Sequence, residues 1–413
     1  MEMKQRDEEL GAPLLFEQAT KIFDGWTDPD TGMRVLRIYT RGQNTEEDIW
    51  ETQYHQFQCF VENGRKVLLA RGASPDVGAA GYFLLDLTTG EITHPFPTGH
   101  VVTAIGDASQ IACVLDTRTG NHRATLWDTR AGREVASVRV DGWELDTCTS
   151  LLCDGQRAVA FFFRGSAYDE HVQSRHYLFG ADTPPQLVLE ADGYFCSHIQ
   201  GCPADPNLYA YDRWPSPERY IEQALHLHTL DGKDVTPVPL DENALRPAVM
   251  FGARDHYLWT PDGTRIVSYM CPHKFEVGPD FNHFDVEWWL SATDWQTGED
   301  LAAKYPPGRW GGHMQVTPDS GYVVCGGAPG FDKLFAVEIE GLRHGWNEQI
   351  ICSYPTTTVT DLRGPFAYPA MLPDQSGVIF NAGWPGPEHG LYLAEWPADL
   401  TSDNNREGLF ALS

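Results

Sequence analysis

The sequence predicts an all-β protein, a seven-bladed β-propeller, and the first observation behind this prediction is a repeat. A short apolar strand, a turn rich in Pro, Asp and Gly, and a second apolar strand recur seven times along the chain. Successive turns are 44 to 58 residues apart, and repeats of about this length are typical of propellers and solenoids. The turns of the seven units are centred near Glu62, Gly106, Cys153, Pro203, Pro261, Pro318 and Pro373.

The second observation is that further strands follow each unit. Apolar and polar residues alternate in these segments, and Gly and Asp separate them, which favours hairpins over helices. Seven sheets of four strands make a propeller. Third strands are expected over 82–91, 124–133, 225–234 and 290–299, and fourth strands over 92–96, 134–140, 186–190, 234–240 and 300–305.

The repeat also predicts the domain organisation. A length of 413 residues alone would favour two or three domains of roughly 150 residues each, but a ring of blades forms one domain. An N-terminal strand at 33–40 has no partner in the first unit, so we expect it to complete the last blade and close the ring. The expected parts of the single domain 1–413 are a closing-strand region at 21–40, blades over 41–399, and peripheral segments at 1–20 and 400–413.

Composition limits the class of partner. Lys and Arg number 30 and Asp and Glu 58, a formal net charge of −28, which argues against nucleic acids and anionic membranes. No apolar run approaches the ~20 residues of a membrane span, and the charged start predicts a cytoplasmic protein. A secreted enzyme without its leader would have the same features. Nine cysteines with no CxxC pair predict reduced, buried thiols.

A register through the innermost strands gathers polar side chains. In a propeller the strand before each turn is innermost, and its side chains alternate between the channel and the blade. Three histidines fall in one register on consecutive blades, followed by a tyrosine, far more than the histidine content of the chain predicts by chance. The residues five before each turn are Phe57, Val101, Cys148, His198, His256, His313 and Tyr368. Two residues earlier, His55 and Arg254 are expected to face the same cavity.

Loops expected at the same end of the channel combine cations with aromatic residues. The loop of the fourth blade carries Arg213, Trp214 and Arg219, the third blade offers Arg164, and the seventh offers Trp384. An aromatic ring stacks on the apolar face of a sugar, and arginine binds a carboxylate with two hydrogen bonds. This combination predicts an acidic oligosaccharide or polysaccharide as the partner.

Each of these residues also has a structural interpretation. The histidines would fill the channel as hydrogen-bonded side chains, the arginines would form ion pairs between blades, and Tyr368 would serve packing. Residues His273, Lys274 and His283 lie on a long loop and are expected to be solvated.

Six segments of the chain, in order, resemble the oligogalacturonate lyases, a family of seven-bladed propellers. They are DPDTGMRVLRIYT, YHQFQCFVENGRKVLL, CSHIQGCPADPNLYAY, DHYLWTPDGTRIVSY, GGHMQVTPDSGYVV and PAMLPDQSGVIF. The resemblance implies that His256 is the base that abstracts a proton, and that Arg213 or Arg219 engages the uronate. It also implies a divalent metal, typically Mn²⁺, with His313 as one ligand. At the three other ligand positions this chain has Arg363, Phe366 and Tyr368.

The resulting hypothesis is a polysaccharide lyase that cleaves a 4-linked uronic acid by β-elimination. The uronate is galacturonate or glucuronate, including a rhamnose–glucuronate linkage, and the product is a 4,5-unsaturated uronate. His256 abstracts the C5 proton, Arg213, Arg219 or Arg254 neutralises the carboxylate, and Tyr368 or His198 protonates the leaving oxygen. A guanidinium is able to replace the metal, so we expect either no cofactor or a divalent cation, Mn²⁺ or Ca²⁺.

Two other classes of function remain open from the sequence. One is a non-catalytic propeller that binds carbohydrate or protein, because the fold alone does not imply chemistry. The other is a metal-dependent hydrolase in which His198, His256 and His313 form a three-histidine site.

Overall fold

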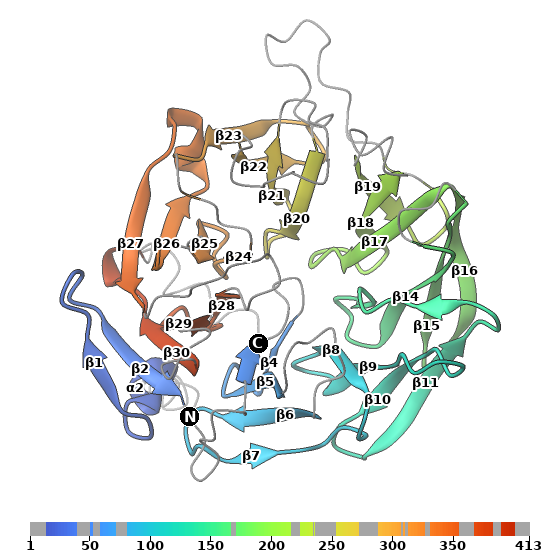
Figure 1. The fold of residues 1–413 in the computed structure, drawn as a ribbon, viewed down its shortest axis with the longest axis horizontal. Coiled ribbons are helices and arrows are strands. Elements are labelled where there is room, and N and C mark those ends of the chain that lie inside the picture. The colour runs from blue at the N-terminus through green and yellow to red at the C-terminus, as the bar shows by residue number, and fades with distance from the viewer. Residues whose placement is uncertain are drawn as a thin grey trace, which may run out of the picture.

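Seven antiparallel sheets form a ring in the computed structural model (Figure 1). The residues described are 14–38, 50–52, 58–71, 81–166, 171–215, 224–233, 235, 253–271, 288–306, 309, 313–326, 331–354, 367–382 and 390–400. Strands dominate them, and the predicted seven-bladed β-propeller is confirmed. No helix within these ranges has the length and hydropathy needed to cross a membrane.

Blades 1 to 3 contain four or five strands each, and three strands of blade 4 are described. Blade 1 consists of β3 (Trp50–Thr52), β4 (Phe60–Val61), β5 (Lys66–Arg71), β6 (Gly81–Asp86) and β7 (Ile92–Thr93). Blade 2 consists of β8 (Val101–Ile105), β9 (Ile111–Asp116), β10 (Arg123–Asp128) and β11 (Arg133–Arg139). Blade 3 consists of β12 (Glu144–Leu145), β13 (Ser150–Leu151), β14 (Arg157–Arg164), β15 (Gln173–Gly180) and β16 (Thr183–Asp192). Blade 4 consists of β17 (Tyr194–Gly201), β18 (Leu208–Pro215) and β19 (Ala224–Thr229).

The last three blades repeat the pattern. Blade 5 consists of β20 (Ala253–Trp259), β21 (Arg265–Cys271), β22 (Trp289–Asp294) and β23 (Asp300–Lys304). Blade 6 consists of β24 (Met314–Val316), β25 (Tyr322–Gly326), β26 (Lys333–Glu338) and β27 (Glu348–Ser353), with the 3-10 helix η5 (Glu340–His344). Blade 7 consists of β28 (Ala370–Met371), β29 (Gly377–Ala382) and β30 (Gly390–Glu395), followed by η6 (Ala398–Leu400). The fourth strand predicted at 234–240 lies outside the described residues except for position 235.

The predicted Gly turns between outer strands share one geometry. In the segments 86–90, 128–132 and 294–298, the backbone N–H of the final Gly donates to the carbonyl of the first Asp at 2.8 Å. The Asp carboxylate accepts from backbone N–H groups two and three residues later, and the Gly has a φ of 61° to 76°. A side chain disfavours that φ, so Asp and Gly at these two positions specify the hairpin.

The N-terminal strand joins the last blade. Strand β2 (Arg34–Ile38) pairs antiparallel with β30, and β1 (Gly25–Thr27), which the sequence did not predict, adds one more strand outside it. The expectation that residues 1–20 are peripheral is wrong for the short helix α2 (Leu15–Ala19). Phe16 is 1% exposed, because α2 packs its apolar face on the core instead of extending into solvent.

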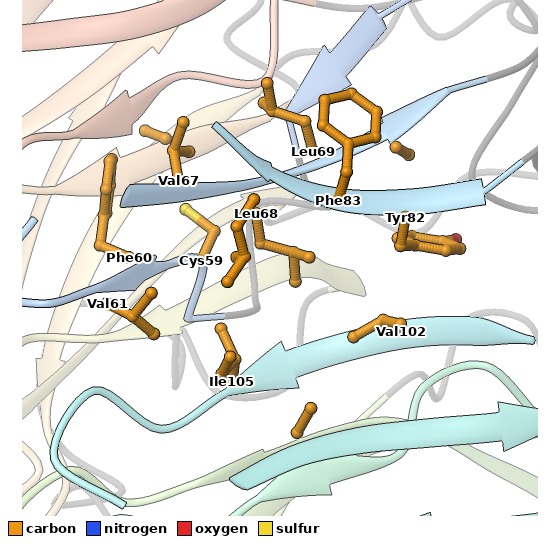
Figure 2. Close-up of a cluster of buried hydrophobic side chains, with 14 of the residues drawn as sticks. Cys59, Phe60, Val61, Val67, Leu68, Leu69, Tyr82, Phe83, Val102 and Ile105 are labelled. Atoms are coloured by element: carbon orange, nitrogen blue, oxygen red, sulfur yellow. The ribbon is translucent and has the colours of Figure 1, made fainter. Parts of the chain in front are cut away.

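The core fills the spaces between blades. Figure 2 shows side chains of β4, β5 and β6 that face Val102 and Ile105 on β8 of the next blade. Leu68, Val102 and Ile105 are all fully buried. The backbone N–H of Ile105 also donates to the carbonyl of Gln58 at 3.2 Å. Burial of such side chains contributes about 1.5–3 kcal/mol each, so packing between sheets holds the ring together.

Candidate active site

Four aromatic side chains from four consecutive blades lie in a row, which we call the histidine row: His198, His256, His313 and Tyr368. Their ring centroids are separated by 6.0 Å, 4.6 Å and 4.4 Å in that order. His198 lies on β17 and His256 on β20, whereas His313 directly precedes β24 and Tyr368 lies two residues before β28. These inner strands follow one another around the centre of the ring (Figure 1). The shared register predicted from the sequence therefore brings these rings together.

The backbone at the histidine row departs from regular strand geometry. Pairing along β17 and β18 shifts between Ser197 and Gln200, and pairing along β20 and β21 shifts between Asp255 and Leu258. Each shift is a bulge, and each bulge contains a histidine of the row. A bulge interrupts the alternation of side chains along the strand, and so re-aims the histidine toward its neighbours.

Three members of the row also have left-handed backbone. The φ angles of His198, His256 and Tyr368 are +52°, +47° and +36°. The five other non-glycine residues of positive φ in the described part of the chain lie in turns between strands. This conformation costs about 1–3 kcal/mol per residue and persists only where the surrounding structure imposes it. Such residues cluster at functional sites, so the strain at three positions of one row favours a functional interpretation.

His198 pairs with a buried carboxylate. Its Nδ1 lies 3.1 Å from Oδ2 of Asp212, whose side chain is fully buried on β18. The hydroxyl of Tyr257 donates to the backbone carbonyl of His198. Burial, followed by the negative charge of Asp212, raises the pKa of Tyr257 well above its usual range. Tyr257 therefore stays a neutral donor that holds the strained backbone of His198.

His256 has a neutral partner instead. Its Nδ1 is hydrogen-bonded to the hydroxyl of Tyr269, and the two rings stack with centroids 5.2 Å apart. Tyr269 is 1% exposed, and its ring meets the edge of Trp288. When Nδ1–H of His256 donates to this hydroxyl, Nε2 carries the lone pair that a general base needs.

Hydrogen bonds between blades 1 and 7 fix the last member of the row. Oγ1 of Thr52 on β3 donates to the carbonyl of Tyr368 at 2.8 Å. The backbone N–H of Thr52 donates to Oδ1 of Asn381, and the N–H of Asn381 donates to the carbonyl of Ala367 at 2.7 Å. The position of Tyr368 therefore depends on contacts that join the first and last blades.

The two remaining register positions that are described, Val101 and Cys148, supply no imidazole, carboxylate or reactive thiolate. Val101 is a buried core residue, and Phe57 lies outside the described residues. Cys148 lies between β12 and β13, where burial raises the pKa of its thiol well above the usual range. A protonated thiol is a poor nucleophile, so Cys148 borders the row without supplying a reactive thiolate.

Two arginines predicted for substrate binding contact aromatic rings. The guanidinium of Arg213 on β18 lies 3.5 Å from the ring centroid of Tyr194, and its buried Nε has no hydrogen-bond partner among the described residues. Arg164 is exposed, lies 5.2 Å from the ring centroid of Trp143, and donates to the carbonyl of Gly142 at 3.2 Å. Neither arginine forms an ion pair within the described residues. The ion pair between blades that the structural interpretation predicts for Arg213 is therefore not found there.

Several predicted site residues are not described, so their positions stay predictions. His55, Arg219 and Trp384 lie outside the described residues, as do Arg363, Phe366, His273, Lys274 and His283. The backbones of Trp214 and Arg254 belong to β18 and β20, but their side chains are outside the description.

The sequence analysis missed three partners of the histidine row: Asp212, Tyr257 and Tyr269. One signal was present in the sequence, because Asp212 interrupts the apolar strand LYAYDRWP at 208–215. A carboxylate inside a strand needs a partner when it is buried. The two tyrosines gave no comparable signal, since Tyr is common in strands.

Comparison with solved structures gives the relatives of the fold. A structure of oligogalacturonate lyase in complex with manganese matches with a TM-score of 0.69 and 18% identity, over 92% of this chain and 97% of that chain. The chain has the propeller fold of the oligogalacturonate lyases. A second such lyase, from Vibrio parahaemolyticus, matches with a TM-score of 0.68 and 16% identity, over 92% and 98% of the two chains.

A more distant match shows that this fold has several uses. Hydrazine synthase from Kuenenia stuttgartiensis gives a TM-score of 0.53 and 12% identity, over 86% of this chain and 98% of that chain. No protein-family profile matches the sequence, and no curated protein sequence matches it either. The predicted resemblance to oligogalacturonate lyases is thus confirmed for the fold, and activity must be argued from the site.

The residues present do not fit the metal that one of these relatives contains. Of the four positions that the resemblance assigns to metal ligands, His313 is retained, whereas Arg363 and Phe366 offer no suitable donor atom. Within the described ranges, no three or more His, Cys, Asp or Glu side chains form a group suited to a metal ion. The three-histidine hydrolase site therefore has no support from the described residues, and we derive no step through a metal.

Proposed function

We propose that this protein is a lyase that cleaves an acidic oligosaccharide at a 4-linked uronate by β-elimination. The observation that carries the proposal is the histidine row, in which neighbouring imidazoles with different partners meet on strained backbone. The likeness of the fold to oligogalacturonate lyases supports the same class of reaction. The strained backbone at His198 and His256 is typical of functional sites.

The proposed reaction assigns one role to each part of the site. The neutral imidazole of His256 takes the C5 proton, which only the adjacent carboxylate acidifies. Arg213 neutralises that carboxylate together with Arg219 or Arg254. The buried Nε of Arg213 is able to donate to it, because no described residue accepts a hydrogen bond from this atom. The bond between C4 and its oxygen then breaks, and Tyr368 or His198 protonates the leaving oxygen.

The substrate class follows from the same groups. Trp214, Trp384 and His55 are proposed to contact the sugar rings, and Arg164 is proposed to contact an acidic group further from the cleavage point. The product retains the carboxylate and gains a double bond between C4 and C5. Galacturonate and glucuronate are both candidates, because they differ in the orientation of O4 rather than in charge.

The direct test is the formation of that double bond. We expect the full chain to generate ultraviolet absorbance of an unsaturated uronate from at least one member of a panel of oligogalacturonates and glucuronate-containing oligosaccharides, including rhamnose–glucuronate. His256→Asn is expected to lower the rate by about 10²–10⁴-fold, the usual contribution of a general base. Asn suits the test because it tolerates left-handed backbone better than most residues.

A matched control is available on the outer side of blade 6. His344 is exposed on η5, so His344→Asn makes the same chemical change away from the histidine row and is expected to leave the rate unchanged. Binding of an acidic oligosaccharide without any alkene product would indicate a binding propeller and would refute the lyase. Equal loss in both variants would refute the role of His256.

A further inference from the structure

We propose that Asp212 is a positioning residue that makes His198 the proton donor to the leaving oxygen, while His256 acts as the base. This inference rests on the proposed function and divides its acid and base steps between two adjacent imidazoles. It selects His198 over Tyr368 for the donor, and it adds Asp212, to which the sequence analysis assigned no role.

Burial of the Asp212 carboxylate supports this assignment. Its side chain is fully buried on β18, and its Oδ2 lies 3.1 Å from Nδ1 of His198. A buried carboxylate is stable only when a cation or hydrogen bonds compensate its charge. A proton on Nδ1 of His198 contributes to that compensation, and it leaves the opposite nitrogen, Nε2, on the side of the ring away from Asp212.

The two imidazoles also have contrasting partners. The ring centroids of His198 and His256 are 6.0 Å apart, yet one ring faces a carboxylate and the other faces the hydroxyl of Tyr269. A carboxylate favours the doubly protonated imidazolium, whereas a hydroxyl does not. Adjacent imidazoles, one beside a charged group and the other beside a neutral hydroxyl, are suited to separate acid and base roles.

The titratable groups of other strands that are described near His198 include an imidazole, a phenol and a thiol. From β20, the Tyr257 hydroxyl and the His256 ring face His198, and from the segment between β12 and β13 the Cys148 thiol lies near its backbone. Burial keeps both the phenol and the thiol in their neutral forms. Arg213 follows Asp212 on β18 but stacks on Tyr194. Asp212 is therefore a charged partner of His198, and the carboxylate of Asp146 adds negative charge beside Cys148.

The proton inventory of the reaction balances with these roles. The C5–H proton moves to Nε2 of His256, and the C5–H electron pair becomes the C4–C5 π bond. The electron pair of the C4–O bond leaves with the oxygen, which takes the proton from Nε2 of His198. After turnover His256 is protonated and His198 neutral, and transfer of one proton between these neighbouring rings through solvent restores the starting state.

The experiment measures the rates of wild type and Asp212→Asn on two substrates that differ in their leaving group. The substitution removes the negative charge of Asp212 and keeps the shape of its side chain. With a sugar as the leaving group, we expect the kcat of Asp212→Asn to fall about 10²-fold or more, with KM within about threefold. With a 4-O-nitrophenyl uronate, whose leaving group needs no proton, the variant is expected to retain a rate within about threefold of wild type. His256→Asn is expected to be slow on both substrates.

Controls separate this role from a structural one. Asp300→Asn alters a carboxylate on β23, where it accepts hydrogen bonds from Ser291 and Thr293, and should leave both rates unchanged. Equal loss on both leaving groups in Asp212→Asn would overturn the proposal, because a general distortion slows every substrate. If Asp212→Asn does not fold, His198→Gln is tested on the same pair, and there too an equal loss overturns it.

A second readout does not depend on activity. In the full chain with ¹⁵N-labelled histidine, we expect the His198 signals at neutral pH to be those of the doubly protonated ring, and to become neutral in Asp212→Asn. A neutral His198 in the wild-type protein would overturn the proposal even where the lyase reaction is observed. Absence of alkene from every substrate would instead reject the proposed function, whatever the state of His198.

Discussion

Acid sensitivity of the protein is expected to come in part from one buried histidine beside the candidate site. His176 on β15 is fully buried, with Nε2 2.8 Å from the carbonyl of Cys196 and Nδ1 3.1 Å from the hydroxyl of Tyr209. Burial lowers the pKa of His176 from 6.5 to about 3, although the Cys196 carbonyl acts in the opposite direction. The neutral ring, with Nε2–H as donor, is therefore the folded form at neutral pH.

The sign and size of the effect follow from linkage. Above pH 6.5 the ring is neutral in both states, so the pKa shift has no effect on the free energy of unfolding. As pH falls from 6.5 toward 3, His176 takes up a proton in the unfolded chain but stays neutral in the folded chain. Each pH unit then costs about 1.4 kcal/mol, which gives a loss of roughly 2 kcal/mol at pH 5.

The test is the change in the free energy of unfolding between pH 7 and pH 5. His176→Gln keeps an amide donor for the Cys196 carbonyl but does not titrate, so its loss on acidification should be smaller by about 2 kcal/mol than that of wild type. Urea titrations followed by tryptophan fluorescence measure both values, with His344→Gln as the exposed control. The same pH dependence in His176→Gln and wild type would refute this reasoning.

Two further predictions concern contacts that position the site and the N-terminal strand. Tyr269→Phe removes the hydroxyl that orients His256, so kcat should fall about tenfold with little change in KM; an unchanged kcat in steady-state assays would contradict this. Arg34→Met removes contacts at 2.5 Å to Glu17 and Glu395, and should lower the free energy of unfolding by about 1 kcal/mol at low salt. Because added salt screens exposed pairs, a loss of equal size in 1 M NaCl would argue against this cause.

Much of the fold was predictable because the repeat is local. The Asp and Gly of segments such as 86–90 specify hairpins whatever their surroundings, and alternation specifies the strands between them. Helix α2 and strand β1 were not predicted, since five and three residues are too short for a periodic signal. Their place in the structure depends on burial of Phe16 and on pairing with β2, which are tertiary contacts.

The candidate site divides in the same way. The shared register placed His198, His256, His313 and Tyr368 on corresponding strands, and the structure brings these rings together. The register did not contain the bulges, because a strand sequence with one extra residue looks like any other. It also gave no means of deciding what each nitrogen contacts.

By itself the sequence determined a ring of seven sheets, an acidic net charge and a shared register of imidazoles at the inner strands. Tertiary structure decided the chemistry of that row, because it placed the carboxylate of Asp212 against His198 and the hydroxyl of Tyr269 against His256. The physical reason is that the two features depend on different kinds of neighbour. Hairpins and alternation follow from neighbours in sequence, whereas the protonation of an imidazole depends on groups within a few ångströms in space, and these arrive from other strands.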